Sequence, residues 1–280
     1  MGYQIYRTTK NELLICDSTG EFRNCQEASF DAIFQAGEAA DYLATVFQKG
    51  TVVAAPALDK LHPPVGDQEI WAAGVTYFRS RTARMEEAES GGGDVFYDKV
   101  YEAPRPELFF KSTASRARGH GDAVCIRSDS TWDVPEPELT LAISSSGKVF
   151  GYSIGNDMSS RSIEGENPLY LPQAKVYKGA CSIGPCLVVR ELPTKETSIH
   201  LKITRNGDTV FQGETNAGQI KRGFDELAEY LFHSNEFPKG AYLMTGTGIV
   251  PDSDFTLANG DGVEISIDGA GTLRNFVETA

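Results

Sequence analysis

Short segments of alternating or continuous apolar residues dominate the chain after residue 107. Their length and their content of β-branched residues are typical of strands. The pair Asn206-Gly207 separates two of them and is a strong signal for a tight hairpin turn. The segments that we predict as strands read ELFFK, AVCIRS, ELTLAIS, KVFGYSIG, CLVVRE, IHLKITRNGDTVFQG and GVEISI.

One segment in this region has a different period. In QIKRGFDELAEYLFHS the apolar side chains recur at helical spacing, at Phe224, Leu227, Ala228, Leu231 and Phe232. This pattern predicts an amphipathic helix among many strands. We therefore expect an α+β, β-rich fold with one continuous core in the larger part of the chain.

The first part of the chain reads as a small α/β unit. Residues 3–8 alternate like a strand, and residues 38–50 have helical spacing that ends at Gly50. Pro56, Pro63 and Pro64 follow and mark a junction between units. We predict a small N-terminal domain at residues 1–65 and a catalytic domain at residues 66–280.

A polar segment interrupts the second unit. The apolar run at residues 70–75 predicts a buried strand, and the charged sequence after it is centred on the glycine triplet at 91–93. Glycine allows large changes in backbone conformation, so we expect residues 76–104 to form a lid over the functional site. The alternative is a solvated surface excursion.

The composition limits the partners and the compartment. The formal net charge is −13, and phosphate backbones require a basic face, so we expect no nucleic-acid partner. We also expect no membrane span, because no apolar run approaches the required ~18 residues, and no secretory signal. The five cysteines form no C-x-x-C pair and the four histidines lack zinc-site spacing. These features predict a cytoplasmic protein with reduced, mostly buried thiols.

Two glutamates stand two residues apart in the stretch WDVPEPEL. Alternate residues of a strand face the same side, so Glu136 and Glu138 share a face if this stretch is extended. Pro135 and Pro137 favour extended backbone. Pro137 also removes a ladder donor, which suits an edge strand or the entrance of a strand. The alternative is that both carboxylates face water or pair with basic side chains.

An aspartate can join this pair through a hairpin. The segments ELTLAIS and KVFGYSIG are separated by a short turn, and the second runs into Asp157. Glu138 and Asp157 lie at similar distances from the turn, so a hairpin brings them to the same end. Three converging carboxylates favour a hard divalent cation such as Mg²⁺ or Mn²⁺.

Several ordered motifs resemble the fumarylacetoacetate hydrolase superfamily. They are PEPEL, GYSIGNDMSSRSIE, LPQAKVYKGACSIGPCLV and LMTGTGIVP, spread over residues 70–275. The resemblance implies a fumarylacetoacetate-hydrolase-like β-roll preceded by a small N-terminal α/β domain. It implies Mg²⁺, for which Mn²⁺ or Ca²⁺ can substitute, held by Glu136, Glu138 and Asp157. It also suggests a homodimer or homotetramer.

Within this superfamily the chain is most similar to the 2-keto-3-deoxy-D-arabinonate dehydratase subgroup. The similar stretches are ELFFKSTASRARGHGDAVCIRSDSTWDVPEPEL and ENPLYLPQAKVY, and the gap from Glu138 to Asp157 is short, as in that subgroup. The resemblance implies a Mg²⁺-dependent hydro-lyase acting on a 2-keto-3-deoxy sugar acid. Loss of a C3 proton and of the C4 hydroxyl would give 2-oxoglutarate semialdehyde.

One departure from the family pattern bears on the reaction. Hydrolytic members carry a histidine–glutamate dyad in the lid, whereas the matching text GVTYFRSRTARMEE contains no histidine. This disfavours the alternative of an acylpyruvate or β-diketone hydrolase and, less firmly, that of an oxaloacetate decarboxylase. A metal-binding scaffold without turnover is a third alternative, against which Lys175 and Thr247 argue.

Two residues are candidates for proton transfer. Lys175, in LPQAKVY, is the expected base, because burial and a nearby dication favour a neutral amine. The alternative is an ordinary surface lysine. Glu107 precedes the apolar run LFFK and is the candidate acid. The alternatives are a structural role for Glu107 beside an arginine, and a water molecule at the cation as the acid.

The remaining candidates would bind substrate. Arg161 and Glu164 follow Asp157 by four and seven residues and share its face if SSRSIE is a helical turn, although a salt bridge is an equal alternative. Gly246 and Thr247 stand in a small-residue turn that can offer a backbone N–H and a hydroxyl to a carboxylate. The alternative is a tight β-turn.

Two further candidates stand in the expected lid. Arg79 and Ser80 are placed there by position alone, and we expect them to bind hydroxyl or carboxylate groups of the substrate. The expected partner is therefore a small anionic 2-keto acid.

Overall fold

The computed structural model describes residues 2–55, 57–77 and 100–280, and in them strands outnumber helices. The largest unit is a ten-stranded sheet with the order β4-β3-β2-β1-β12-β10-β9-β15-β5-β6. Its strands are β1 (Tyr3–Arg7), β2 (Leu13–Asp17), β3 (Phe22–Asn24), β4 (Thr51–Val53), β5 (Glu69–Gly74), β6 (Glu107–Ser112), β9 (Pro137–Ile143), β10 (Val149–Asp157), β12 (Cys181–Val189) and β15 (Ala241–Met244).

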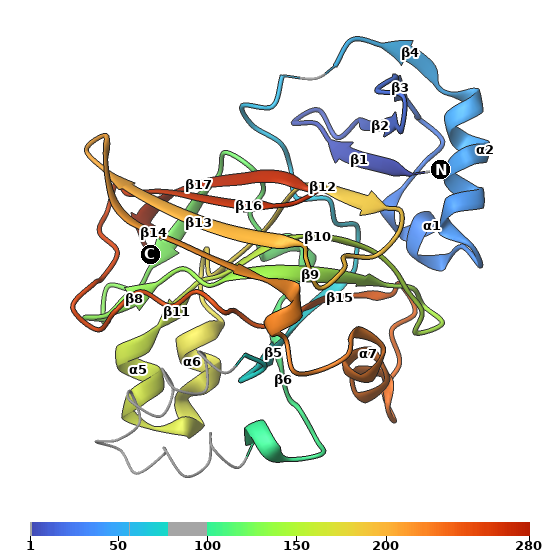
Figure 1. The fold of residues 1–280 in the computed structure, drawn as a ribbon. Coiled ribbons are helices and arrows are strands. Elements are labelled where there is room, and N and C mark those ends of the chain that lie inside the picture. Colours follow the sequence, from blue (N-terminus) through green and yellow to red (C-terminus); the bar gives the residue numbers. More distant parts are fainter. Residues whose placement is uncertain (1, 56, 78–99) are drawn as a thin grey trace.

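A second sheet of five strands packs against the first (Figure 1). Its order is β14-β13-β16-β17-β7, and a separate two-stranded ladder joins β11 to β8. The bounds are β7 (Ala123–Ile126), β8 (Asp133–Val134), β11 (Ser159–Ser160), β13 (Ser198–Arg205), β14 (Asp208–Asn216), β16 (Gly262–Ile267) and β17 (Gly271–Thr279). The predicted turn at Asn206-Gly207 is confirmed: both residues have positive φ and they join β13 to β14.

Helices are short and lie around the sheets (Figure 1). The predicted helices ending at Gly50 and carrying the Phe224–Phe232 stripe are confirmed, and Leu227, Ala228 and Leu231 are buried in the second. The α-helices are α1 (Phe30–Gln35), α2 (Ala39–Lys49), α5 (Arg161–Glu166), α6 (Leu171–Lys175) and α7 (Phe224–Phe232). The 3₁₀ turns are η2 (Ala114–Arg116), η3 (Pro168–Tyr170) and η4 (Ala217–Gln219).

The N-terminal strands continue the large sheet. Strand β1 pairs with β12, and one apolar cluster contains Ile5 and Phe34 from the N-terminal region together with Ala142 and Ile183. The N-terminal elements still gather at one end of the molecule (Figure 1). The division at residue 65 therefore remains a prediction.

The expectation that Glu138 lies on an edge strand is wrong. Strand β9 lies between β10 and β15, in the interior of the large sheet. The alternative, a strand entrance, is confirmed, because Pro137 is the first residue of β9. Pairing with β15 begins only at Thr140, so the missing N–H of Pro137 breaks no bond on that side.

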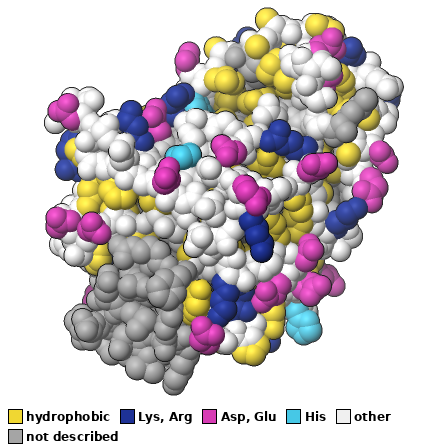
Figure 2. All heavy atoms as spheres, viewed as in Figure 1, with side chains coloured by type: hydrophobic (Ala, Val, Ile, Leu, Met, Phe, Trp, Pro, Cys, Tyr) yellow, Lys and Arg dark blue, Asp and Glu magenta, His cyan; other side chains and the backbone are white. Residues whose placement is uncertain are grey.

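The surface carries charges of both signs. On the described part of the face in Figure 2, acidic and basic side chains are interspersed. Over the whole sequence the acidic residues are in excess, which gives the net charge of −13. All five cysteines are buried and unpaired, as expected. In the described part of the chain, no helix combines the length and apolar character needed to cross a membrane. Most of the expected lid at 76–104, including Arg79 and Ser80, lies outside the described residues.

Candidate metal and catalytic site

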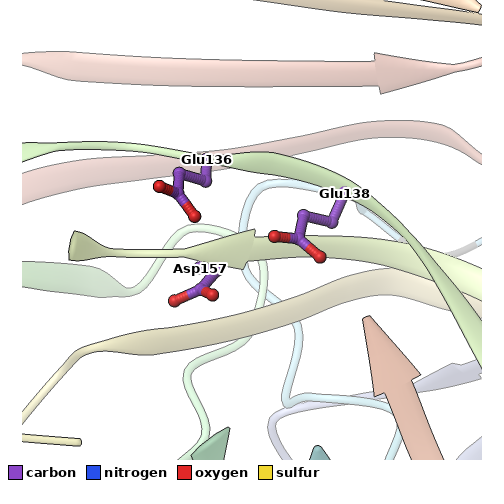
Figure 3. Close-up of side chains that lie close together, drawn as sticks. All are labelled: Glu136, Glu138 and Asp157. Carbon is purple, nitrogen blue, oxygen red and sulfur yellow. The ribbon is translucent and has the colours of Figure 1, made fainter. Parts of the chain in front are cut away.

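Three carboxylates converge at the open end of the β9–β10 hairpin. Glu138 lies opposite Gly155 in the ladder, and the N–H of Asp157 donates to the carbonyl of Glu136 at 3.0 Å. One carboxylate oxygen from each acidic residue lies within 4.8 Å of the others. All three side chains are buried, and Figure 3 shows their carboxyl groups turned toward the same space. The predicted convergence of Glu136, Glu138 and Asp157 is therefore confirmed.

The hairpin itself follows from its sequence. The turn at residues 144–148 is closed by a hydrogen bond from Ser144 N–H to the carbonyl of Lys148 at 2.9 Å, and Gly147 supplies a positive φ of 83°. Gly155 has no side chain opposite Glu138. A Cβ there would lie 2.3 Å from Thr140 Oγ1, so the close approach of the two strands requires glycine.

Lys175 reaches the carboxylates from the last residue of α6. Its Nζ donates to Glu136 Oε2 at 2.6 Å, to Asp157 Oδ2 at 3.3 Å and to Ser159 Oγ at 2.5 Å. The side chain is fully buried, which excludes the alternative of an ordinary surface lysine. The Phe109 ring lies beside it, with 5.7 Å from Nζ to the ring centroid.

A second buried lysine was not among the sequence candidates. Lys111, in β6, pairs with Asp157 Oδ1 at 2.5 Å and donates to the backbone carbonyls of Lys175 at 2.5 Å and Met158 at 3.0 Å. The only sequence signal was a lysine at the end of the apolar run LFFK, a position where a charge needs a partner. Ser159 was also missed, because nothing in the sequence indicates which hydroxyl meets Lys175.

Arg161 begins helix α5, whose N-cap is Ser160. Its Nη2 donates to Glu136 Oε1 at 2.6 Å, and both side chains are buried. The expectation that Arg161 and Glu164 share a helical face with Asp157 is wrong, because Asp157 ends strand β10 and the helix starts only at Arg161. Glu164 is buried within α5.

The turn after β15 holds Glu138 in place. Gly246 has a φ of 92°, and its N–H donates to Glu138 Oε2 at 2.6 Å. The expectation that this N–H is offered to substrate is therefore replaced by a contact with a carboxylate of the site. The Thr247 hydroxyl lies within the turn, 3.2 Å from the carbonyl of Ile249.

Glu107 lies next to the site through the β5–β6 ladder. It pairs with Gly74, and a Cβ on Gly74 would lie within 1.9 Å of Glu107 Oε2. The carboxylate therefore rests on a glycine that itself lines the site pocket. Glu107 is half-buried, as expected of a candidate acid.

A narrow pocket joins these groups. Its volume of about 10 Å³ leaves room for about one water molecule. Among the described residues no histidine lines it. The lining consists of Ala73, Gly74, Val75, Phe109, Glu136, Glu138, Asp157, Arg161, Lys175, Gly246 and Thr247.

The electrostatics of the three carboxylates differ. Burial, and then the charges of Asp157 and Glu136, raise the pKa of Glu138 well above its usual value. Burial also opposes ionisation of Asp157, but Lys111 and Lys175 hold the pKa of that carboxyl below its usual value. Within the described part of the chain, no lysine or arginine forms an ion pair with Glu138. A further cation beside the buried Glu138 would therefore stabilise its ionised form.

These residues fit a hard divalent cation. Three carboxylates each direct an oxygen toward one space, and oxygen ligands are those that Mg²⁺ and Mn²⁺ prefer. A dication there would offset both the burial and the repulsion by Asp157 and Glu136 that raise the pKa of Glu138. Glu136, Glu138 and Asp157 are the residues that could hold it.

The comparisons with known proteins agree with this site. Residues 70–278 match the family model described as fumarylacetoacetate (FAA) hydrolase C-terminal. The chain is 51% identical over 218 residues to a probable 2-keto-3-deoxyxylonate dehydratase of Haloferax volcanii, covering 77% of this chain and 74% of that protein. It is 44% identical over 217 residues to the 2-dehydro-3-deoxy-D-arabinonate dehydratase of Saccharolobus solfataricus, covering 76% and 73%.

Solved structures give the same picture. The fold matches 2-keto-3-deoxy-D-arabinonate dehydratase complexed with magnesium and 2,5-dioxopentanoate, with a TM-score of 0.83 and 33% identity over 100% of this chain and 99% of that one. The expected β-rich, fumarylacetoacetate-hydrolase-like fold is confirmed. The family match covers well over half of the sequence. The chain therefore belongs to the fumarylacetoacetate hydrolase family.

Proposed function

We propose that the protein is a Mg²⁺-dependent dehydratase of a 2-keto-3-deoxy sugar acid of the 2-keto-3-deoxy-D-arabinonate type. The product would be 2-oxoglutarate semialdehyde, also called 2,5-dioxopentanoate. The observation that carries this proposal is the position of Lys175, whose Nζ touches two of the three converging carboxylates inside a narrow pocket. A base is thereby placed beside the residues that would hold the cation.

Mg²⁺, when bound, supplies Lewis-acid charge beside the carboxylate and keto oxygens of a 2-keto acid, which makes the C3 proton more acidic. Glu136, Glu138 and Asp157 would hold it. Lys175 then accepts the C3 proton at Nζ. A lysine is a base only when neutral, and a neighbouring dication favours that form.

The second half of the dehydration needs an acid. We propose that Glu107 donates a proton to the C4 hydroxyl, which leaves as water while a C3–C4 double bond forms. Isomerisation then gives the semialdehyde: C5 loses one C–H hydrogen and its hydroxyl hydrogen, and C3 and C4 each gain one hydrogen. The place of Glu107 next to Gly74 of the pocket supports this role.

Substrate binding is assigned to several polar groups. Arg161 and Thr247 line the pocket, and we propose that they bind the anionic end of the substrate. We propose that Glu164 supports Arg161 within α5, and that Arg79 and Ser80 bind substrate hydroxyls. Apolar walls from Val75 and Phe109 would exclude water from the reacting carbons.

The hydrolase and decarboxylase alternatives are not favoured. Hydrolytic members use a histidine–glutamate dyad that decarboxylases can share, and no histidine occurs among the described residues of the pocket. The two curated relatives described above are dehydratases. We further propose a cytoplasmic location, which five unpaired buried cysteines support, and a homodimer or homotetramer in solution.

The test is a panel of 2-keto acids, assayed with Mg²⁺ and with EDTA. We expect semialdehyde from 2-keto-3-deoxy-D-arabinonate or its enantiomer only when Mg²⁺ is present, and none from Glu138→Gln. Surface Glu229→Gln, in the exposed part of α7, serves as the matched control and should keep full activity. Pyruvate release from acylpyruvates without any dehydration would contradict the proposal.

A further inference from the structure

Each carboxylate of the site has one oxygen held by a donor from outside the β9–β10 hairpin. Arg161 Nη2 holds Glu136 Oε1 at 2.6 Å, and the Gly246 N–H holds Glu138 Oε2 at 2.6 Å. Lys111 Nζ holds Asp157 Oδ1 at 2.5 Å. The three donors come from three different parts of the chain: α5, the turn after β15, and β6.

The other oxygens face inward. Glu136 Oε2 and Asp157 Oδ2 both contact Lys175 Nζ, so these two atoms point into the same space. One oxygen from each of the three carboxylates lies within 4.8 Å of the other two. Each acidic side chain therefore directs one oxygen into this space, where Glu136 and Asp157 meet Lys175, and its second oxygen is held by a group outside the hairpin.

Single-oxygen carboxylates discriminate between cations. Mg²⁺ takes six ligands at about 2.0–2.1 Å and keeps several waters, whereas Ca²⁺ takes six to eight ligands at about 2.3–2.6 Å and often binds both oxygens of a carboxylate. We propose that Lys111, Arg161 and the Gly246 N–H are positioning groups that restrict each carboxylate to one oxygen. They would thereby favour Mg²⁺ over Ca²⁺.

Lys111 is the clearest of these groups. The Lys111 ammonium donates to the carbonyls of Lys175 and Met158 and forms an ion pair with Asp157 Oδ1. The side chain is 1% exposed. Its orientation is therefore fixed from three sides, and Asp157 cannot turn its second oxygen inward without breaking a buried ion pair.

The inference concerns binding and rests on the proposed function only in taking Mg²⁺ as the working ion. The experiment is calorimetric titration of the metal-free full-length protein, without substrate, with Mg²⁺ and with Ca²⁺. It compares the wild type with Lys111→Met, which keeps most of the apolar stem and frees Asp157 Oδ1. Removing a positive charge changes the affinity for both dications similarly, so the ratio of the two dissociation constants isolates the geometric effect.

We expect the ratio Kd(Ca²⁺)/Kd(Mg²⁺) to fall about tenfold in Lys111→Met, the lower range for loss of a group that orients a metal ligand. The control is Lys148→Met, which removes an exposed lysine paired with Glu38 and should leave the ratio unchanged. An unchanged ratio in Lys111→Met would overturn the inference.

A second variant and a second measurement guard against misfolding. Arg161→Met frees Glu136 Oε1 and should lower the ratio in the same direction. Infrared difference spectra of Mg²⁺ binding to the wild type should show the carboxylate stretches of one-oxygen coordination, and a two-oxygen pattern would contradict the inference. If the protein prefers Mg²⁺ but has no dehydratase activity, the proposed function is contradicted and the inference on metal selectivity is not.

Discussion

Lys175 and Lys111 are both fully buried, yet the atoms around their ammonium groups differ. Lys111 donates to two backbone carbonyls and forms an ion pair with Asp157, and it does not line the pocket. Lys175 lines the pocket and faces the inward oxygens of Glu136 and Asp157. Lys175 is therefore the better candidate for the base, because a substrate carbon in the pocket can approach its Nζ and cannot approach that of Lys111.

Replacement of this base should separate turnover from metal binding. In Lys175→Met we expect kcat to fall by about 10²–10⁴, the usual contribution of a general base, while Mg²⁺ still binds. Initial rates of semialdehyde formation and calorimetry with Mg²⁺ would measure the two effects. Lys178→Met is the matched control, because this lysine is exposed three residues further on. A normal rate in Lys175→Met would refute its assignment as the base.

Another acidic residue outside the metal-binding group gives a pH-dependent prediction. Burial raises the pKa of Asp133 to about 6, and its Oδ1 has no hydrogen-bond partner. In the unfolded chain an aspartate titrates near 4. Between these values the folded state binds the proton and the unfolded state does not, so this group makes the protein more stable as the pH falls from 6 to 4.

The variant Asp133→Asn mimics the protonated form. At pH 8 we expect it to be more stable than the wild type by roughly 2–3 kcal/mol, since about two pKa units separate the folded and unfolded values. The difference should shrink toward zero near pH 4. Urea unfolding of both proteins at the two pH values measures it. A difference that does not depend on pH would contradict the role given to Asp133.

At the scale of elements, the local sequence is sufficient to predict the side chains that a single hairpin brings together. Glu138 and Asp157 lie in two strands joined by a short turn and Glu136 directly precedes the first of them, so alternation and distance from the turn were sufficient to bring them together. Lys111 could not be found in this way, because its contact depends on β6 joining the sheet through β5 and β15. The interior position of β9 was missed for the same reason, since a distant strand covers its second side.

The turn after β15 offers an element-scale test. Gly246 and Gly207 share a φ of 92°, but a Cβ on Gly246 would lie 2.0 Å from Thr76 Oγ1, whereas nothing lies within 4 Å of a Cβ on Gly207. Gly207→Ala should cost about 1 kcal/mol for the left-handed backbone alone. Gly246→Ala should cost about 1–3 kcal/mol more through overpacking.

Only one of the two substitutions should change the affinity for Mg²⁺. A displaced Gly246 N–H no longer holds Glu138 Oε2, so Mg²⁺ affinity should fall in Gly246→Ala and stay normal in Gly207→Ala. Thermal unfolding and calorimetry on both variants test this. Equal stability losses, or normal Mg²⁺ affinity in Gly246→Ala, would count against the proposed role of the turn.

At the scale of the whole molecule, the large sheet joins the two predicted domains. Strand β1 covers one side of β12, and all nine residues of β12 are buried. A chain that starts at residue 66 would leave β12 as a long apolar edge. We expect such a truncated chain to aggregate on refolding, as light scattering would show, while the full chain under the same conditions stays in solution. A truncated chain that remains monomeric and binds Mg²⁺ would show that residues 66–280 fold independently.

The β9–β10 hairpin has one more consequence, for protein engineering. All three carboxylates lie within one continuous segment, residues 136–157, whereas the groups that touch them come from β6, α5, α6 and the turn after β15. A graft of this hairpin into another antiparallel sheet would transfer the cation ligands in a single insertion. Selectivity and proton transfer would have to be rebuilt on the host, because the residues assigned to both lie in elements of this protein outside the hairpin.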